Sequence, residues 1–150
     1  MSPLPSYHAI LVVDDVNLVS RPMARMLAEA GYRVYEAGSG EEALEVLRTA
    51  RRPIDLVITD VRMPEMNGVE LMRRIAAEWP ETKMLFMSAY PAEVLVQEGL
   101  AYPAMHFLAK PFTRADLLQK VQAAMGLERR RSERPWGVVP ESEWNRPTDQ

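Results

Sequence analysis

Short apolar runs and longer amphipathic patterns alternate along the chain. The first run, Ile10–Val13, is unbroken and rich in β-branched residues, as expected of a strand that is buried on both faces. The next pattern places apolar residues at helical spacing over residues 19–30, and Gly31 follows it as a typical residue at a helix C-terminus. Pro22 lies inside this pattern, which predicts either a helix that begins near Ser20 or a kink in its first turns.

The alternation continues as far as residue 126. Four further strands are predicted at Arg33–Ala37, Ile54–Thr59, Met84–Met87 and His106–Leu108. Helices are predicted after three capping pairs, Ser39 with Glu42, Asn67 with Glu70, and Thr113 with Asp116, and one more over Ala92–Glu98. Strands that alternate with helices in this way predict an α/β fold, a parallel sheet with helices on both faces and right-handed crossovers.

Polar side chains stand where the predicted strands end. Asp14 and Asp15 follow the first strand, Asp60 follows the third, Ser88 the fourth and Lys110 the fifth. The carboxyl ends of parallel strands meet at one edge of the sheet, which is where open α/β sheets bind ligands. The sequence therefore predicts a site with three carboxylates, a hydroxyl and an ammonium group.

These residue types favour metal-assisted phosphoryl chemistry. Clustered carboxylates repel one another unless a proton or a cation offsets their charge, and an all-oxygen ligand set selects a hard ion, with Mg²⁺ as the best candidate. Asp60 is the best candidate nucleophile, because a central strand would hold it rigidly and carboxylates accept phosphoryl groups. A single Asp at a strand end is more often a turn or a helix cap, so the prediction depends on all five residues occurring together.

The same residues resemble the receiver domain of two-component response regulators. The resemblance covers about residues 7–126 and rests on Asp14-Asp15, Asp60 followed by Met63-Pro64 and Gly68, Ser88-Ala89, Phe107, and Lys110-Pro111-Phe112. It implies a flavodoxin-like (βα)5 doubly wound fold, with a five-stranded parallel sheet in the order 2-1-3-4-5.

The resemblance also implies the chemical roles of the site residues. Asp60 would be the phosphoacceptor, which receives the group from the phosphohistidine of a histidine kinase or phosphotransfer protein in a Mg²⁺-dependent reaction. Asp15 and Asp60 would bind Mg²⁺ directly, Asp14 mainly through water, and the backbone carbonyl of Arg62 would be a further ligand. Lys110 would pair with a phosphoryl oxygen.

A conformational switch is implied by two more positions. Ser88 would turn its hydroxyl towards the phosphoryl group, and Phe107 occupies the position of the switch aromatic residue. Ser88 stands where threonine is common, and Phe107 lacks the tyrosine hydroxyl that is often found there. The Lys110–Pro111 bond matches one that is usually cis in this family, against a background of about 5–6% for X-Pro bonds.

Two local features change the expectations for this chain. Arg62 and Tyr90 stand two residues beyond Asp60 and Ser88, at positions that the resemblance implies flank the approach of water. Their size predicts that they shield the phosphoryl group, and the alternative is that both side chains point into solvent without a kinetic role. The segments 98–103 and 106–112 are more similar to receivers attached to hybrid histidine kinases.

Three other functions compete with the receiver for the same residues. A haloacid-dehalogenase-type phosphatase also uses an aspartate nucleophile, magnesium and a lysine, but needs a second Asp where Arg62 stands. A flavodoxin-like cofactor carrier would have a phosphate-binding loop rich in Ser, Thr and Gly after the first strand, where Asp14 and Asp15 would repel a phosphate. A receiver-like scaffold that is never phosphorylated stays open on sequence alone.

Composition and charge limit the remaining possibilities. The 150 residues are 47% hydrophobic and 26% charged, with no cysteine, no recognisable signal peptide and no apolar run of about 20 residues. A cytoplasmic protein is therefore expected, and the resemblance to receivers implies a signalling domain and not an enzyme acting on a separate substrate. The net charge of −3 argues against direct binding of nucleic acid.

Residues 1–126 are expected to form the receiver, and residues 127–150 a tail or linker that is too short for an effector domain. The tail combines Arg129–Arg131 and several prolines with Trp136 and Trp144, so a frayed end and a docking segment both stay possible. The cognate kinase, the stimulus, the downstream partner and the oligomeric state are not predicted.

Overall fold

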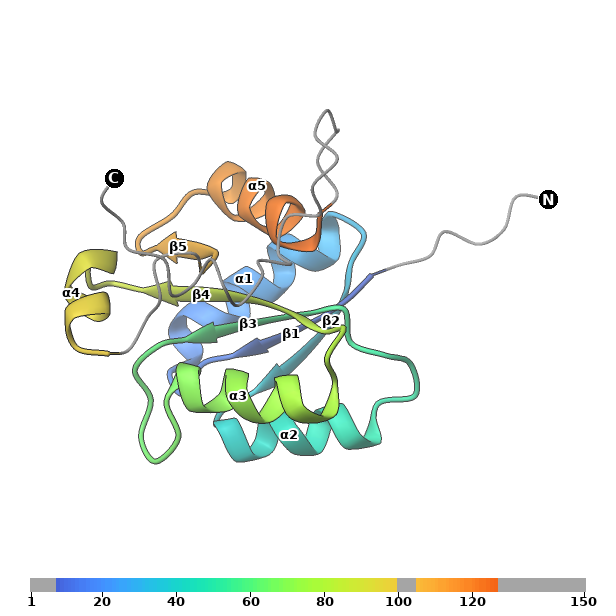
Figure 1. Cartoon of the computed structure of the whole chain (residues 1–150). Coiled ribbons are helices and arrows are strands. Elements are labelled where there is room, and N and C mark those ends of the chain that lie inside the picture. Colours follow the sequence, from blue (N-terminus) through green and yellow to red (C-terminus); the bar gives the residue numbers. More distant parts are fainter. Residues whose placement is uncertain (1–7, 100–104, 127–150) are drawn as a thin grey trace.

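A five-stranded parallel sheet with helices on both faces forms the part of the protein that the computed structural model describes, residues 8–99 and 105–126 (Figure 1). The strands are β1 (Ala9–Val13), β2 (Arg33–Ala37), β3 (Leu56–Asp60), β4 (Lys83–Ser88) and β5 (Phe107–Ala109). They lie in the order β2-β1-β3-β4-β5, and each neighbouring pair is parallel. The predicted fold class and strand order are confirmed.

The helices follow the strands in strict alternation. They are α1 (Asn17–Glu29), α2 (Gly40–Thr49), α3 (Gly68–Glu78), α4 (Ala92–Gln97) and α5 (Arg114–Met125). Helices α1 and α5 lie on one side of the sheet, and α2 and α3 on the other (Figure 1). Among the described helices, none has both the length and the apolar composition needed to cross a bilayer.

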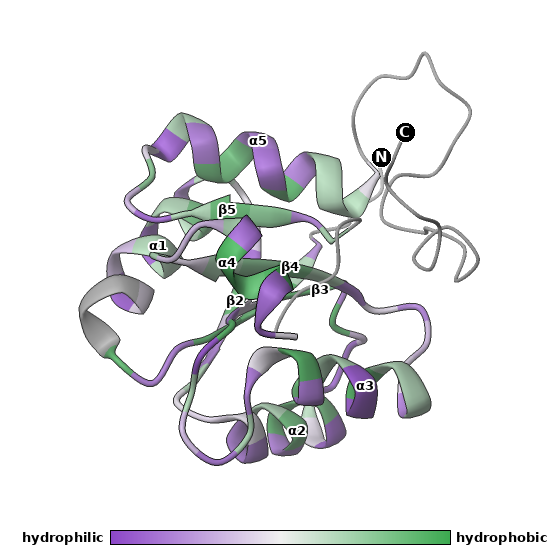
Figure 2. Ribbon diagram, turned by 60° about the vertical axis from the view of Figure 1, so that its left-hand side comes forward, coloured by the Kyte–Doolittle hydropathy of each residue, from purple (hydrophilic) through white to green (hydrophobic). Residues whose placement is uncertain are grey.

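The period of two along the strands divides the core between the two faces of the sheet. In β1, Ile10 and Val12 belong to the cluster under α1 and α5, whereas Leu11 and Val13 belong to the cluster under α2 and α3. All four side chains are fully buried, as the unbroken apolar run predicts. Figure 2 shows mostly hydrophobic central strands, with hydrophilic residues concentrated on the surrounding helices and loops.

A third apolar cluster lies under α4 and links it to α3 and β5. It consists of the buried residues Val61, Val69, Met72, Phe86 and Leu95, with Met84, Met105 and Phe107 packed against it. Leu95 is the only buried side chain of the short helix α4, so one contact point fixes this helix to the core.

The capping residues explain where three helices begin. The Asn67 and Thr113 side chains accept hydrogen bonds from the backbone N–H groups of Glu70 and Asp116. The Glu70 and Asp116 carboxylates in turn accept from the backbone N–H groups of Asn67 and Thr113, which completes a capping box at both sites. The Ser39 side chain also accepts a hydrogen bond, from the Glu42 N–H. The Glu42 carboxylate, however, accepts from the Gly38 N–H instead of the Ser39 N–H, so the capping box is incomplete.

One boundary differs clearly from the sequence prediction. Helix α1 begins at Asn17 and contains Pro22, so a start near Ser20 is wrong. Pro22 lacks only the N–H that would donate to the carbonyl four residues earlier, and the buried residues Met23 and Leu27 keep this helix packed on the sheet. The predicted tail, residues 127–150, lies outside the described residues.

Candidate functional site

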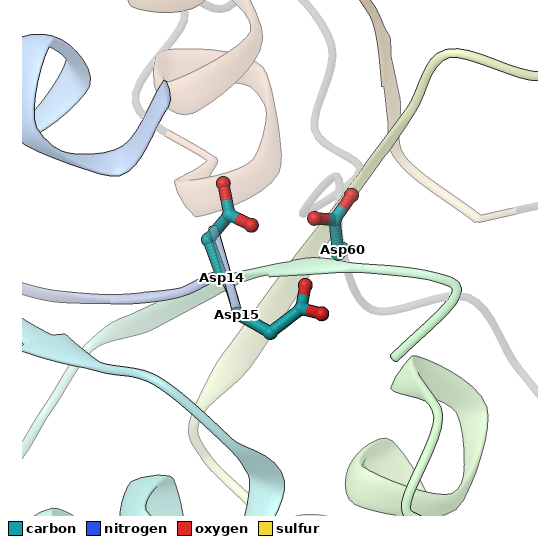
Figure 3. Close-up of side chains that lie close together, drawn as sticks. All are labelled: Asp14, Asp15 and Asp60. Carbon is teal, nitrogen blue, oxygen red and sulfur yellow. The ribbon is translucent and has the colours of Figure 1, made fainter. Parts of the chain in front are cut away.

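Three carboxylates gather at the carboxyl edge of the sheet. Asp14 and Asp15 follow β1 directly, and Asp60 is the last residue of β3. One carboxylate oxygen from each lies within 4.8 Å of the others, and Figure 3 shows the three side chains beside one another. Asp14 and Asp60 are buried, with 1% and 8% of their surface exposed, whereas Asp15 is exposed. The cluster is therefore open to solvent on the side of Asp15.

The Asp14 side chain is held in place but is only half satisfied. Its Oδ1 accepts a hydrogen bond from the Val16 N–H at 3.0 Å, and its own N–H donates to the carbonyl of Ala37 at 3.1 Å. Its Oδ2 is buried and has no hydrogen-bond partner within the described ranges. A buried carboxylate oxygen without a partner costs stability, and a cation at this edge would remove that cost. The geometry therefore fits a metal ion bound by oxygen ligands.

Lys110 supplies the positive charge of the site. Its Nζ lies 3.0 Å from Oδ1 and 3.3 Å from Oδ2 of Asp60, and its backbone N–H donates to the carbonyl of Ser88 at 2.9 Å. The Lys110–Pro111 bond is cis, as predicted. The loop after β5 thus brings the ammonium group to the end of β3.

The surroundings of Asp60 change its acidity. Burial, and after it the neighbouring Asp14 carboxyl, raises the pKa of Asp60 to about 7, although Lys110 acts in the opposite direction. Without a cation, Asp60 therefore holds its proton up to about neutral pH. A bound cation would favour the ionised form that a nucleophile requires.

Gly68 allows the first turn of α3 to approach Asp60 closely. A Cβ at this position would lie 2.6 Å from the backbone carbonyl oxygen of Asp60 and 3.1 Å from the Cα of Val61. The Gly68 N–H donates to the carbonyl of Val61 at 2.8 Å. Only glycine fits here without a shift of the backbone, which explains its place in the motif.

Ser88 and Phe107 lie on the neighbouring strands β4 and β5. Ser88 is buried, and its Oγ accepts a hydrogen bond from the Tyr90 N–H at 3.0 Å. Phe107 is half-buried and packs against the cluster that holds Leu95 of α4. Ser88 therefore lies at the edge of the site, whereas Phe107 lies at the start of β5, in contact with the cluster under α4.

The Arg62 side chain makes contacts that sequence reasoning did not anticipate. Its guanidinium carbon lies 4.4 Å from the centre of the Tyr90 ring, and the guanidinium forms an ion pair with Glu98. Sequence analysis singled out Arg62 and Tyr90 but not Glu98 as a partner. Glu98 is 36 positions away and carries no motif of its own, so only the packing of α4 reveals the pair.

Comparisons with known proteins agree on one family. A family model described as the response regulator receiver domain matches residues 10–122. The response regulator receiver protein CpdR of Brucella abortus is 34% identical over 113 residues, which are 75% of this chain and 92% of CpdR. The sensor kinase CckA of the same organism is 36% identical over 113 residues, also 75% of this chain but only 12% of the kinase.

Solved structures give the same result. The chemotaxis protein CheY4 of Vibrio cholerae aligns with a TM-score of 0.69 and 33% sequence identity, over 78% of this chain and 98% of CheY4. The receiver domain of the hybrid histidine kinase CckA aligns with a TM-score of 0.65 and 32% identity, over 78% of this chain and 98% of that domain.

Proposed function

The chain belongs to the response-regulator receiver family, and on that basis we propose that it accepts a phosphoryl group on Asp60 from the phosphohistidine of a histidine kinase or phosphotransfer protein. The observation that carries the proposal is the position of Asp60. It ends β3 with the Lys110 Nζ at 3.0 Å and with carboxylate oxygens of Asp14 and Asp15 within 4.8 Å.

The transfer exchanges one bond to phosphorus for another. An oxygen of ionised Asp60 attacks the phosphorus, a P–O bond forms as the P–N bond of the phosphohistidine breaks, and the electron pair returns to the histidine nitrogen. Lys110 already contacts both oxygens of Asp60 and is placed to pair with a phosphoryl oxygen. Burial of Asp60 excludes water from its inner side, so the incoming group must arrive from the open side near Asp15.

Asp14, Asp15, Asp60 and the backbone carbonyl of Arg62 are the proposed ligands of one Mg²⁺ ion. They offer only oxygen atoms, which fits a hard divalent cation, and Asp14 Oδ2 is buried without a partner in the described part of the chain. When bound, Mg²⁺ offsets the negative charge of the carboxylates and of the phosphoryl oxygens.

We propose Ser88 and Phe107 as the switch. Rotation of the Ser88 hydroxyl towards a phosphoryl oxygen would break its hydrogen bond with the Tyr90 N–H and leave space near β5. Phe107 packs in the same cluster as Leu95, so movement of the Phe107 ring would change the position of α4 on the core. The output surface would then be formed by α4, β5 and α5.

The proposal describes a phosphoacceptor domain over residues 1–126, not an enzyme with a separate substrate. A dehalogenase-type phosphatase is disfavoured because Arg62 replaces the acid it requires and is engaged with Glu98 and Tyr90. The downstream effector is open, nucleic acid is not proposed as a direct partner, and the cytoplasmic location stays a prediction.

The test is incubation with acetyl phosphate and Mg²⁺, followed by intact-mass measurement. The wild type should gain one phosphoryl mass and Asp60→Asn should gain none. Asp55→Asn is the matched control, because Asp55 lies just before β3 at the opposite edge, where its carboxylate accepts from the Ala9 N–H at 2.8 Å. Equal labelling of Asp60→Asn would refute the assignment, and absence of labelling in the wild type would favour the scaffold alternative.

A further inference from the structure

Arg62, Tyr90 and Glu98 form a chain of contacts that we call the Arg62 bridge. The guanidinium stacks on the Tyr90 ring, 4.4 Å from its centre, and pairs with the Glu98 carboxylate. The side chains of Arg62 and Glu98 are 42% and 45% exposed. With only one of these contacts, the long and half-exposed Arg62 side chain could adopt several rotamers. The two contacts together hold its guanidinium against the Tyr90 ring.

The Arg62 bridge spans the edge of the sheet beside the acceptor. Arg62 lies two residues beyond Asp60 in the loop after β3, and Tyr90 lies two residues beyond Ser88 in the loop after β4. These strands are neighbours, with Asp60 aligned to the residue before Ser88. A contact between the two loops must therefore cross the carboxyl edge next to Asp60.

Glu98 connects this crossing to α4. It is the residue that caps the C-terminus of α4, and its N–H donates to the carbonyl of Val94 at 3.0 Å. Helix α4 is attached to the core through Leu95, its only buried side chain. The position of α4 therefore decides whether Glu98 can reach Arg62.

We propose that Glu98 is a positioning residue that holds Arg62 against Tyr90 and thereby slows the loss of the phosphoryl group from Asp60. This inference rests on the function proposed above. Glu98 acts in this way only while α4 keeps the position described above, so phosphorylated molecules in which the proposed switch has moved α4 lose the phosphoryl group faster.

The reaction that the Arg62 bridge slows is hydrolysis of the acyl phosphate. A water oxygen forms a bond to phosphorus as the bond from phosphorus to the Asp60 oxygen breaks. The electron pair stays on the Asp60 carboxylate, and the proton of the water leaves to bulk solvent. The guanidinium has no acceptor atom that could take this proton. The Arg62 bridge therefore acts by excluding water from the in-line approach, not by activating it.

The experiment measures the decay of phosphorylated protein by intact mass, after labelling with acetyl phosphate or phosphoramidate and removal of the donor. Glu98→Gln should decay about two- to fivefold faster than the wild type, the range expected from loss of one half-exposed ion pair. Raising the ionic strength should move the decay of the wild type towards that of Glu98→Gln. Glu93→Gln removes the same charge from the first turn of the same helix and should leave the decay rate unchanged.

The Arg62→Gln background separates positioning from a general structural effect. It keeps the backbone carbonyl and removes the guanidinium, so Glu98→Gln should have no further effect on decay in that background. An equal acceleration in both backgrounds, or a decay of Glu98→Gln as slow as that of the wild type, overturns the positioning role while labelling of Asp60 stands. Absence of labelling at Asp60 overturns the proposed function and this inference together.

Discussion

Lys110 donates hydrogen bonds to both carboxylate oxygens of Asp60, at 3.0 and 3.3 Å, across 50 positions of sequence. This pair is the only contact of Asp60 described here that favours its ionised form, because burial and Asp14 both raise its pKa. In the proposed function, the ammonium group would favour the ionised form of the acceptor and would attract the incoming phosphoryl oxygens.

Replacement of Lys110 should impair phosphorylation directly. In Lys110→Gln the pKa of Asp60 rises further, because the charge that lowers it is gone. We expect the initial rate of labelling by acetyl phosphate at pH 7 to fall about tenfold or more, since one pKa unit or about 1.4 kcal/mol corresponds to tenfold. Lys83→Gln, at the first residue of β4 on the opposite edge, should label at the rate of the wild type. Equal rates in both variants would contradict the role of Lys110.

The raised pKa of Asp60 predicts how stability depends on pH in the absence of metal. The folded protein holds this proton up to about pH 7, whereas the unfolded chain releases it near 3.8. The folded state therefore binds more protons between these values, so the contribution of Asp60 to stability is fully present below about pH 4 and is lost as the pH rises to about 7.

Urea unfolding in the presence of a chelator tests this pH dependence. Asp60→Asn cannot titrate, so its stability relative to the wild type should increase from pH 4 to pH 7 and stay constant above. Three pKa units set an upper limit of about 4 kcal/mol on the change. A difference that is constant over this range would show that the Asp60 pKa is near its ordinary value.

The acidic cluster should bind Mg²⁺ weakly before phosphorylation. Asp15→Asn removes one proposed ligand and one negative charge from the cluster. We expect about tenfold weaker binding by calorimetry, equivalent to about 1.4 kcal/mol, together with a higher melting temperature without metal because repulsion is reduced. Asp116→Asn, in the capping box of α5, should lose some stability but keep the Mg²⁺ affinity of the wild type. Unchanged affinity in Asp15→Asn would remove this residue from the ligand set.

The sequence predicts the elements and the edge at which the site forms because both depend on local patterns. The run Ile10–Val13 and the capping pairs at Asn67 and Thr113 identify strands and helix starts without knowledge of the rest of the chain. Asp14 and Asp60 converge because parallel strands end at one edge.

What the sequence does not predict depends on tertiary packing. The ion pair between Arg62 and Glu98 joins a loop to the end of α4, and neither residue has a sequence pattern that selects the other. Helix α1 begins at Asn17 and not near Ser20, because the packing of its buried face outweighs the hydrogen bond that Pro22 cannot make. The raised pKa of Asp60 cannot be predicted from the sequence, because it depends on how deeply the side chain is buried and on the position of the Asp14 carboxyl.

The backbone conformation of Glu65 is a further feature that the sequence does not predict. Its φ is +69°, in the left-handed region that non-glycine residues rarely adopt, in a tight turn where the Met66 N–H donates to the carbonyl of Pro64 at 2.7 Å. Glu65→Gly should stabilise the protein by about 0.5–1 kcal/mol. Glycine removes the steric cost of the left-handed conformation, but part of this gain is offset because glycine gives the unfolded chain more conformational entropy. Urea unfolding at pH 7 measures the gain. Glu65→Ala keeps the Cβ and should give no gain, and equal stabilisation by both variants would point to the charge instead.

Phe107 offers the sharpest test of the proposed switch. It packs against the cluster that contains Leu95 of α4, while Phe112 is also half-buried but packs against the core on the side of α1 and α5. Beryllofluoride, added together with Mg²⁺, mimics the phosphoryl group. Hydrogen exchange of the wild type with and without this addition should show altered protection in α4 and β5. Phe107→Leu keeps an apolar side chain, so a stability loss of about 1 kcal/mol is expected, but the smaller side chain should reduce the response in α4. Phe112→Leu should lose similar stability and keep the response. If both variants respond like the wild type in α4, the signal does not pass through Phe107, and a response confined to the loops around Asp60 would show that no signal reaches α4 at all.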